Sequence, residues 1–161
     1  PAVKVNSGQW TVDSEETVVG GQWSVVSAEK PITVMAQHVV TAAEKEIVVP
    51  VSAHGVANKV IISYEFDLRY DPSVIQPQEN PVDVAGTVSR GLMVVANPYE
   101  QGLLRVVVYG PMPIYEDGVL LNFRFAAVGN AGSVSPLIWE RIMFNEGEPL
   151  VTIANGQVSL F

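Results

Sequence analysis

The stretch 60–72 shows the clearest alternation of apolar and polar residues in the chain. Its two kinds of side chain fall on opposite parities, which is the period of two expected of a half-buried strand. The apolar set is Val60, Ile62, Tyr64, Phe66, Leu68 and Tyr70, and the polar set is Ser63, Glu65, Asp67 and Arg69. The run stops at Asp71-Pro72, because proline fixes φ and has no N–H for a ladder bond. The pattern predicts a long strand with one face in a core.

Further short strands are predicted from residue 32 onward, each bounded by Gly, Pro, Asn or Asp. They cover 32–36, 46–53, 74–76, 92–96, 103–109, 118–128, 136–144 and 157–161. Asn97-Pro98 and Gly110-Pro111 are expected to end two of them. Pro50 indicates an edge strand or a bulge. The segments 41–45 and 77–90 are interpreted as a turn and a loop.

Eight or nine strands without a helical pattern predict an all-β fold, an antiparallel β-sandwich of jelly-roll or Greek-key type. The connections are too short for parallel crossovers through helices. The expected core is Val49, Val51, Ile62, Tyr64, Phe66, Leu68, Val107, Tyr109, Leu121, Phe123, Phe125, Ile142 and Val158, with Trp139 at its margin.

Residues 1–31 differ from the rest and are interpreted as an N-terminal extension or linker, with the sandwich module at 32–161. They carry a short repeat, Gly-Gln-Trp at 8–10 and again at 21–23. Two copies are too few for a solenoid. We expect two short extended segments turned at Gly20-Gly21, with Trp10 and Trp23 laid on the sandwich or the linker. The alternative is a tryptophan pair that stacks on sugar rings.

Composition narrows the classes of partner. The net charge is -8 and the nine Lys and Arg residues are spread singly along the chain, which argues against a nucleic-acid partner. The sequence has no cysteine, no long apolar run and no signal-peptide layout. Because it begins at Pro1 without Met, we expect a module of a longer protein.

The sequence offers little material for catalysis or a metal site. His38 and His54 are 16 residues apart and lack the spacing of zinc ligands. The acidic clusters at 15–16, 116–117 and 146–148 lack the layout of a calcium loop. Glu65 and Asp67 point the same way, but a flat sheet face does not enclose a general acid. We therefore expect neither an enzyme nor a metal or cofactor of the chain's own.

Four segments resemble one family in order and spacing. YEFDLRYDPSVI at 64–75 is similar to the signature third strand of cohesin modules, which ends in Tyr-Asp-Pro, a small residue and an aliphatic pair. VPV at 49–51, the segment 116–127 and NGQV at 155–158 resemble further strands of that family. The likeness covers 32–161 and leaves residues 1–31 outside.

The resemblance implies a nine-stranded jelly-roll sandwich that binds a dockerin, a module whose paired EF-hand-like loops carry the calcium. It implies a non-catalytic module of a secreted or cell-surface protein that assembles or anchors other proteins. In the family the partner helix lies on the sheet of the third, fifth, sixth and eighth strands. Polar residues, often Asn then Asp, point out of the third strand there. The corresponding positions are Ser63 and Glu65, which depart from that pattern.

The strand at 103–109 is apolar on both parities except at Arg105. An antiparallel strand with one solvent-exposed face should alternate. The outer face of this strand is therefore covered by a partner or by residues 1–31, unless its apolar residues are incidental. In the family's register Val106 and Val108 point outward. We predict a partner-binding surface of Ser63, Glu65, Asp67, Val106 and Val108, with the valines as apolar anchors.

The sequence is also compatible with two other functions. One is a structural or adhesive β-sandwich of a surface protein without a dedicated partner. The other is a carbohydrate-binding module, which a row of Trp or Tyr on the outer face would favour. The aliphatic, acidic and serine residues expected there favour protein binding, so a polysaccharide partner is not expected.

Overall fold

The computed structural model divides the chain into two compact units, residues 1–30 and 31–161. It describes four short strands of the first unit, and of the remainder Lys30 and every residue except 58 and 148. No helix occurs in these described parts, and so none that is long and apolar enough to cross a membrane. The division lies one residue from the predicted boundary between 31 and 32.

The first unit is a small sheet in the order β1-β2-β3-β4. Its strands are β1 (Ala2–Val3), β2 (Gln9–Trp10), β3 (Glu16–Val19) and β4 (Gln22–Val25). The Gln-Trp pairs of the two repeats, Gln9-Trp10 and Gln22-Trp23, lie in β2 and β4, and both strands pair with β3. The predicted turn at Gly20-Gly21 and the placement of the Trp10 and Trp23 side chains lie outside the described residues.

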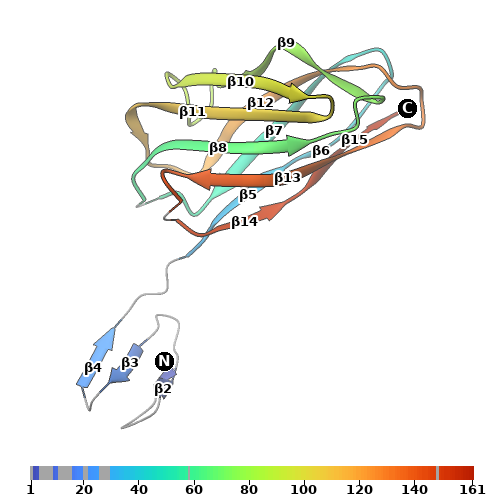
Figure 1. Cartoon of the computed structure of the whole chain (residues 1–161). Helices are drawn as coiled ribbons and strands as arrows, with labels where there is room; N and C mark the ends of the chain where they lie inside the picture. The colour runs from blue at the N-terminus through green and yellow to red at the C-terminus, as the bar shows by residue number, and fades with distance from the viewer. Residues whose placement is uncertain are drawn as a thin grey trace. The chain divides into compact units, whose positions relative to one another are not determined.

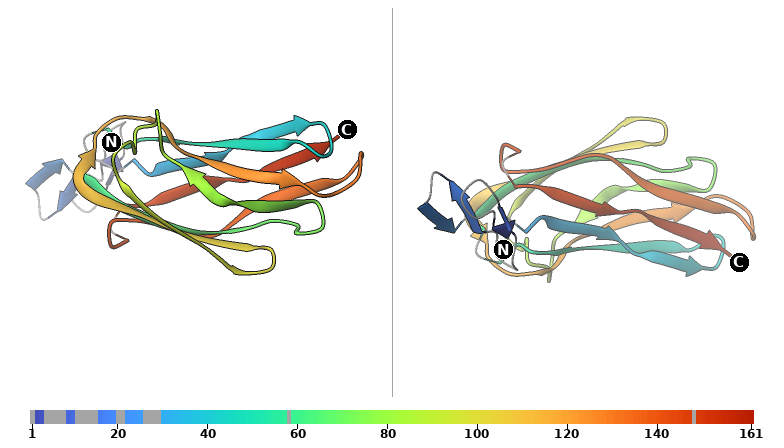
Figure 2. Two further views of the ribbon diagram at one scale, coloured as in Figure 1. Left: turned by 90° about the horizontal axis from the view of Figure 1, so that it is seen from above. Right: turned by 90° about the horizontal axis from the view of Figure 1, so that it is seen from below.

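The second unit is all-β, as predicted, and its two sheets form the layers of a sandwich (Figures 1 and 2). Its strands are β5 (Ile32–Ala36), β6 (His38–Thr41), β7 (Glu46–His54), β8 (Ile61–Arg69), β9 (Ile75–Asp83), β10 (Met93–Glu100), β11 (Leu103–Ile114), β12 (Gly118–Ala127), β13 (Val134–Phe144), β14 (Val151–Ala154) and β15 (Gly156–Leu160). The six-stranded sheet has the order β10-β11-β8-β13-β15-β6, and the five-stranded sheet β14-β5-β7-β12-β9.

The described part of this unit has eleven strands rather than about nine, because β6 and β14 were not predicted. Both belong to parallel pairs, β6 with β15 and β14 with β5, whereas the sequence favoured antiparallel pairing throughout. The chain passes from β5 in one sheet to β6 in the other within two residues, at Gln37. One edge of each sheet thus joins a strand from the start of the unit to a strand from its end, β6 to β15 in one sheet and β5 to β14 in the other.

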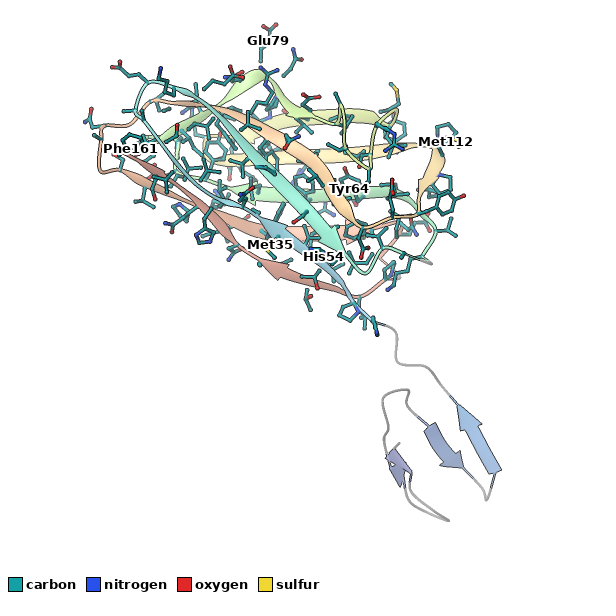
Figure 3. The ribbon with its side chains drawn as sticks, turned by 180° about the vertical axis from the view of Figure 1, so that it is seen from behind. Met35, His54, Tyr64, Glu79, Met112 and Phe161 are labelled. Carbon is teal, nitrogen blue, oxygen red and sulfur yellow. The ribbon has the colours of Figure 1, made fainter. Side chains whose placement is uncertain are left out.

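The long strand predicted from the alternating pattern is β8, which lies between β11 and β13 (Figure 1). Tyr64, Phe66 and Leu68 are buried, as expected. The Tyr64 side chain points between the two layers (Figure 3), where its hydroxyl lies 2.8 Å from Ser89 Oγ. Burial raises the pKa of Tyr64, so this hydroxyl stays protonated and hydrogen bonded in the core.

Aromatic rings join the two sheets. Phe66 packs edge-on against Phe123 of β12 at 5.6 Å between ring centroids. It also packs edge-on against Trp139 of β13 at 5.0 Å. Trp139 is 4% exposed and its indole N–H donates to Ala154 O at 3.0 Å. The prediction that Trp139 lies at the core margin is therefore wrong.

The first part of β8 does not follow the predicted parity. Ile61 is buried, whereas Ile62 is 49% exposed and Val60 is 61% exposed. Asn145 binds the strand at this point, since its backbone N–H donates to Ser63 O and its side-chain carbonyl accepts from the Ile62 N–H. Ile62 was predicted in the core. Because the alternation of buried and exposed residues shifts by one position between Ile61 and Tyr64, Ile62 lies on the outer face instead.

The phase predicted for β11 is also wrong. Val106 and Val108 are fully buried, whereas Val107 is half-buried and Tyr109 is 44% exposed. The reason is the register with β8, in which Val108 pairs with the buried Tyr64. Directly paired residues of an antiparallel sheet lie on the same face, so the outward positions assigned to Val106 and Val108 are corrected.

Prolines did not end strands where the sequence indicated. β10 continues through Pro98, which an edge strand tolerates. β11 continues through Pro111, but the pairing with β8 jumps from Tyr109 to Ile114, so this proline lies in an irregular part of the ladder. Pro50 lies in a central strand, one residue beyond the last β5–β7 pair, Ala36 and Val51.

Candidate functional site

The candidate site is the outer face of β10, β11, β8 and β13, called the four-strand face below. The ladder registers bring residues from all four strands into rows across it. The rows are Met93–Tyr109–Ser63, Val95–Val107–Glu65–Met143 and Asn97–Arg105–Asp67–Arg141. Apolar side chains dominate the first two rows and charged side chains the third.

Four apolar side chains on β10 and β11 form what we call the apolar strip, Met93, Val95, Val107 and Tyr109. Met93 pairs with Tyr109, and Val95 pairs with Val107. Met93 is 58% and Val95 is 53% exposed. Neighbouring exposed apolar side chains on a folded domain commonly mark an interaction surface.

Six charged side chains on β8, β11 and β13 form what we call the charged band. They are Glu65, Asp67, Arg69, Arg105, Glu140 and Arg141. Three carboxylates and three guanidinium groups give the band no net charge. Each carboxylate is bound by an arginine of a neighbouring strand, so the charges are neutralised within the sheet.

Asp67 is the centre of the charged band. Its two carboxylate oxygens accept from Arg105 Nε at 2.9 Å and Arg105 Nη2 at 3.0 Å, which is the bidentate geometry of a strong pair. Arg141 Nε lies 3.7 Å from the same carboxylate. The hydrogen bonds and then the charge of Arg105, followed by the charge of Arg141, hold the pKa of Asp67 below its usual range, although burial opposes them.

The remaining charges of the band are paired as well. Arg141 Nη1 donates to Glu65 at 3.2 Å. Arg69 binds Glu140 with two nitrogens and also reaches Glu100 of β10 at 3.4 Å. The bonds with Arg69 lower the pKa of Glu140.

Tyr99 of β10 covers one cation of the band. Its ring lies 4.3 Å from the guanidinium carbon of Arg105, a distance at which a cation and an aromatic face attract each other. Arg105 is therefore held by Asp67 on one strand and by Tyr99 on another, so its side chain is fixed before any partner binds.

The structure places three of the five predicted site residues on this face. Ser63 and Glu65 are half-buried and Asp67 is 6% exposed. Val106 and Val108 are in the core, so they are not available to a partner. Sequence reasoning missed the outward Val107 and Tyr109, since both parities of that strand are apolar. It also missed the arginines, although Arg105 is the one charge in an apolar run.

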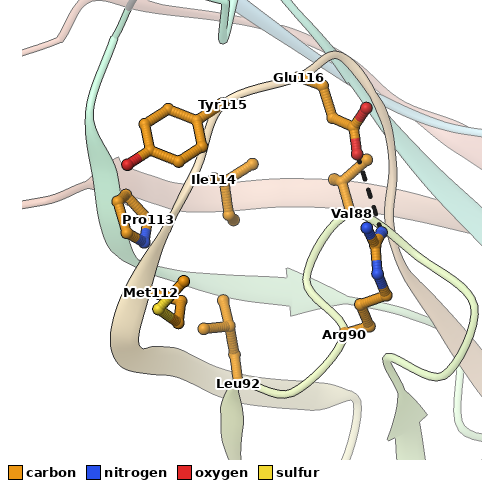
Figure 4. Close-up of a pocket in the computed structure, with 8 residues that line it drawn as sticks. All are labelled: Val88, Arg90, Leu92, Met112, Pro113, Ile114, Tyr115 and Glu116. Carbon is orange, nitrogen blue, oxygen red and sulfur yellow. Dashed lines mark ion pairs between the residues drawn. The ribbon is translucent and has the colours of Figure 1, made fainter.

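A separate hollow of about 490 Å³ lies at one end of the sandwich (Figure 4). Its lining is Val88, Arg90, Leu92, Met112, Pro113, Ile114, Tyr115 and Glu116. Arg90 and Glu116 lie 3.7 Å apart and are largely exposed. An open apolar hollow with one exposed ion pair offers no enclosed acid–base pair for catalysis.

Within the described ranges, no group of three or more His, Cys, Asp or Glu residues is placed to hold a metal ion. The acidic pair at 116–117 has a structural use, because Asp117 accepts from the backbone N–H of Val56 at 2.7 Å and of Ala57 at 3.4 Å. These bonds lower the pKa of Asp117.

Residues 32–158 match the family model described as Cohesin domain. This chain belongs to the cohesin family. No relative was found among curated proteins. The resemblance noted at the third strand is confirmed, because the matched residues include all of β8.

Solved cohesin structures share the fold of this cohesin. The sixth cohesin of scaffoldin B from Acetivibrio cellulolyticus, solved with a mutant Cel5 dockerin, has a TM-score of 0.69 at 21% identity. A cohesin of OlpA from Clostridium thermocellum, solved in a type I cohesin–dockerin complex, has a TM-score of 0.70 at 21% identity. Each match covers 82% of this chain and 100% of the other.

A third similar structure is a non-cellulosomal cohesin from the hyperthermophilic archaeon Archaeoglobus fulgidus. It has a TM-score of 0.67 at 21% identity, and the match covers 82% of this chain and 92% of that one. The sandwich of this cohesin is thus similar both to a scaffoldin cohesin and to a non-cellulosomal cohesin.

Proposed function

We propose that this cohesin is a non-catalytic module that binds a dockerin-type protein on the four-strand face. The single observation that carries the proposal is the exposed apolar strip beside the charged band on this face. Apolar contacts surrounded by polar groups are the usual anatomy of a protein interface. Membership of the cohesin family and the dockerin complexes of similar structures support the choice of partner.

The chain needs no cofactor of its own in this function. The calcium belongs to the loops of the dockerin-type partner, which fold around it. The module would then serve a secreted or cell-surface protein, in which residues 32–161 bind the partner and residues 1–31 act as an extension or linker.

Three predicted residues keep a role in this proposal. Ser63 lies in the same row as Tyr109 and Met93, so its hydroxyl can hydrogen bond a partner that lies on the apolar strip. Glu65 borders the strip through its pairing with Val107. Asp67 acts indirectly, because its carboxylate is occupied by Arg105.

Carbohydrate binding is less well supported. The exposed tyrosines of the four-strand face are Tyr99 and Tyr109. Met93, the pairing partner of Tyr109, is six residues from Tyr99 along β10, which is roughly 20 Å in an extended strand. Tyr99 is moreover occupied by Arg105, so the two rings do not form a continuous platform for sugar rings.

Calorimetric titration of the full chain with a panel of purified dockerins, in calcium and again in chelator, tests the proposal. We expect a specific complex with at least one dockerin in calcium and loss of that complex in chelator. A pull-down from the secreted and envelope proteins of the source organism extends the search beyond the panel. Absence of any dockerin in both experiments would overturn the proposal in favour of a structural module.

A further inference from the structure

The two halves of the four-strand face differ in what they offer a partner. In the apolar strip Met93, Val95 and Tyr109 are exposed and Val107 is half-buried. The strip has no polar group apart from the Tyr109 hydroxyl. The side chains of the charged band are engaged with one another. The Val107–Glu65 pair and the Arg105–Asp67 pair are only two residues apart along the strands. The halves therefore lie side by side, and one partner helix can lie across both.

The charges of the band are paired with one another, and Arg69 also reaches Glu100 of β10. Asp67 has 9% of its side chain exposed and uses both oxygens on Arg105. Arg141 is shared between Glu65 and Asp67. A partner that offers a new charge here must break an existing pair or leave it desolvated, and either process cancels most of the Coulomb gain.

Resting on the proposed function, we propose that this cohesin selects its dockerin through the apolar strip, while the charged band gives no net attraction. The preferred partner presents a helix whose contact residues are aliphatic or aromatic at i, i+3, i+4 and i+7. The band acts against helices that place an unpaired charge over it, because such a charge loses water without gaining a counterion.

The position of the polar residues on β8 supports this difference between the apolar strip and the charged band. Ser63 and Glu65 are the polar residues of β8 that pair with Tyr109 and Val107 of the apolar strip. Glu65 is bound by Arg141 at 3.2 Å and its side chain is 27% exposed, so its carboxylate is less available than a free polar group. Recognition in this proposal accordingly rests on the neighbouring strands β10 and β11.

The experiment compares two pairs of variants against the dockerin that binds the unaltered chain most tightly. In the strip, Met93→Ser and Val95→Ser remove apolar surface from residues more than half exposed, so the fold is retained. In the band, Glu140→Gln and Arg141→Gln each remove one charge from a partly exposed side chain. We expect each strip variant to weaken binding at least tenfold and each band variant to change it less than threefold.

Salt supplies a second readout. A complex held by the apolar strip should change its Kd less than threefold between 50 and 500 mM NaCl, since few charges are newly paired on binding. A loss above tenfold in either band variant, or a tenfold weakening with salt, would overturn the inference even though the dockerin binds. Binding of no dockerin by the unaltered chain would instead be failure of the proposed function.

Discussion

Arg105 and Asp67 face each other across β11 and β8 and are joined by two hydrogen bonds of 2.9 and 3.0 Å. The pair lies on the outer face of the sheet, yet only 6% of Asp67 is exposed. Arg141 from β13 approaches the same carboxylate at 3.7 Å. One carboxylate thus connects three strands, and it links the stability of the sheet to the charge pattern of the proposed binding face.

Replacement of Asp67 should make the free energy of unfolding less dependent on pH in the acidic range. The folded pKa of Asp67 is lowered, so its stabilising effect is present above the unfolded pKa of about 4 and is lost as pH falls through the folded value. We expect Asp67→Asn to lower the free energy of unfolding by about 1–2 kcal/mol at neutral pH. Urea denaturation should show that this difference shrinks below about pH 4.

The matched control is Glu79→Gln, which removes a carboxylate from an exposed position on β9 (Figure 3). It should change stability by less than about 0.5 kcal/mol. If Asp67→Asn is as stable as the unaltered chain at neutral pH, the pair with Arg105 does not contribute to the stability of the fold.

Substitution of a charged residue for Val107 or for its neighbour Val108 on β11 should have opposite effects on folding. Val107→Asp places the carboxylate on the outer face, so the protein should fold and lose its partner. Val108→Asp places it in the core, where Val108 is 0% exposed, and an unpaired buried charge should unfold the sandwich. Circular dichroism and calorimetric titration of the two variants distinguish these outcomes.

Val48→Asp is the control for binding, since Val48 is 48% exposed on β7 in the other sheet. It should fold and bind as the unaltered chain does. A folded Val108→Asp variant, or a Val107→Asp variant that binds normally, would contradict the observed phase of β11 or its place in the interface.

The buried hydroxyl of Tyr64 should contribute to stability through Ser89. Tyr64→Phe leaves Ser89 Oγ, which is fully buried, without its partner at 2.8 Å. We expect a loss of about 1–2 kcal/mol in the free energy of unfolding. The double variant Tyr64→Phe/Ser89→Ala should recover part of it, because neither polar atom then remains unpaired; a purely additive loss would argue against the bond.

Gly156, where β15 begins, should not tolerate a side chain. A Cβ at this position would lie 2.6 Å from Ala36 O and 2.8 Å from Gln37 O, both backbone atoms. We expect Gly156→Ala to destabilise the sandwich by about 2 kcal/mol or more. Gly132→Ala meets no atom within 4 Å and is strained only by its φ of 94°, so thermal denaturation should show a smaller loss, of about 1 kcal/mol.

The local alternation of apolar and polar residues predicted the strands that have one solvent-exposed and one buried face. In β8 the alternation of Tyr64, Phe66 and Leu68 with charged residues is visible in the sequence and is observed in the structure. The family motif at 64–75 begins in this strand and continues past its end at Arg69, so this part of the chain indicated both the fold and the family. The short parallel strands β6 and β14 were missed, because their pairing joins segments more than 100 residues apart.

The sequence by itself determined the all-β class, the central strand and the family, since burial on one side imposes a period of two that neighbouring residues reveal. Only the tertiary structure decided which valines of β11 face a partner. Both parities of that strand are apolar, and its phase follows from pairing with Tyr64 on another strand. The charged band likewise joins residues between 38 and 76 positions apart, and no local pattern specifies such partners.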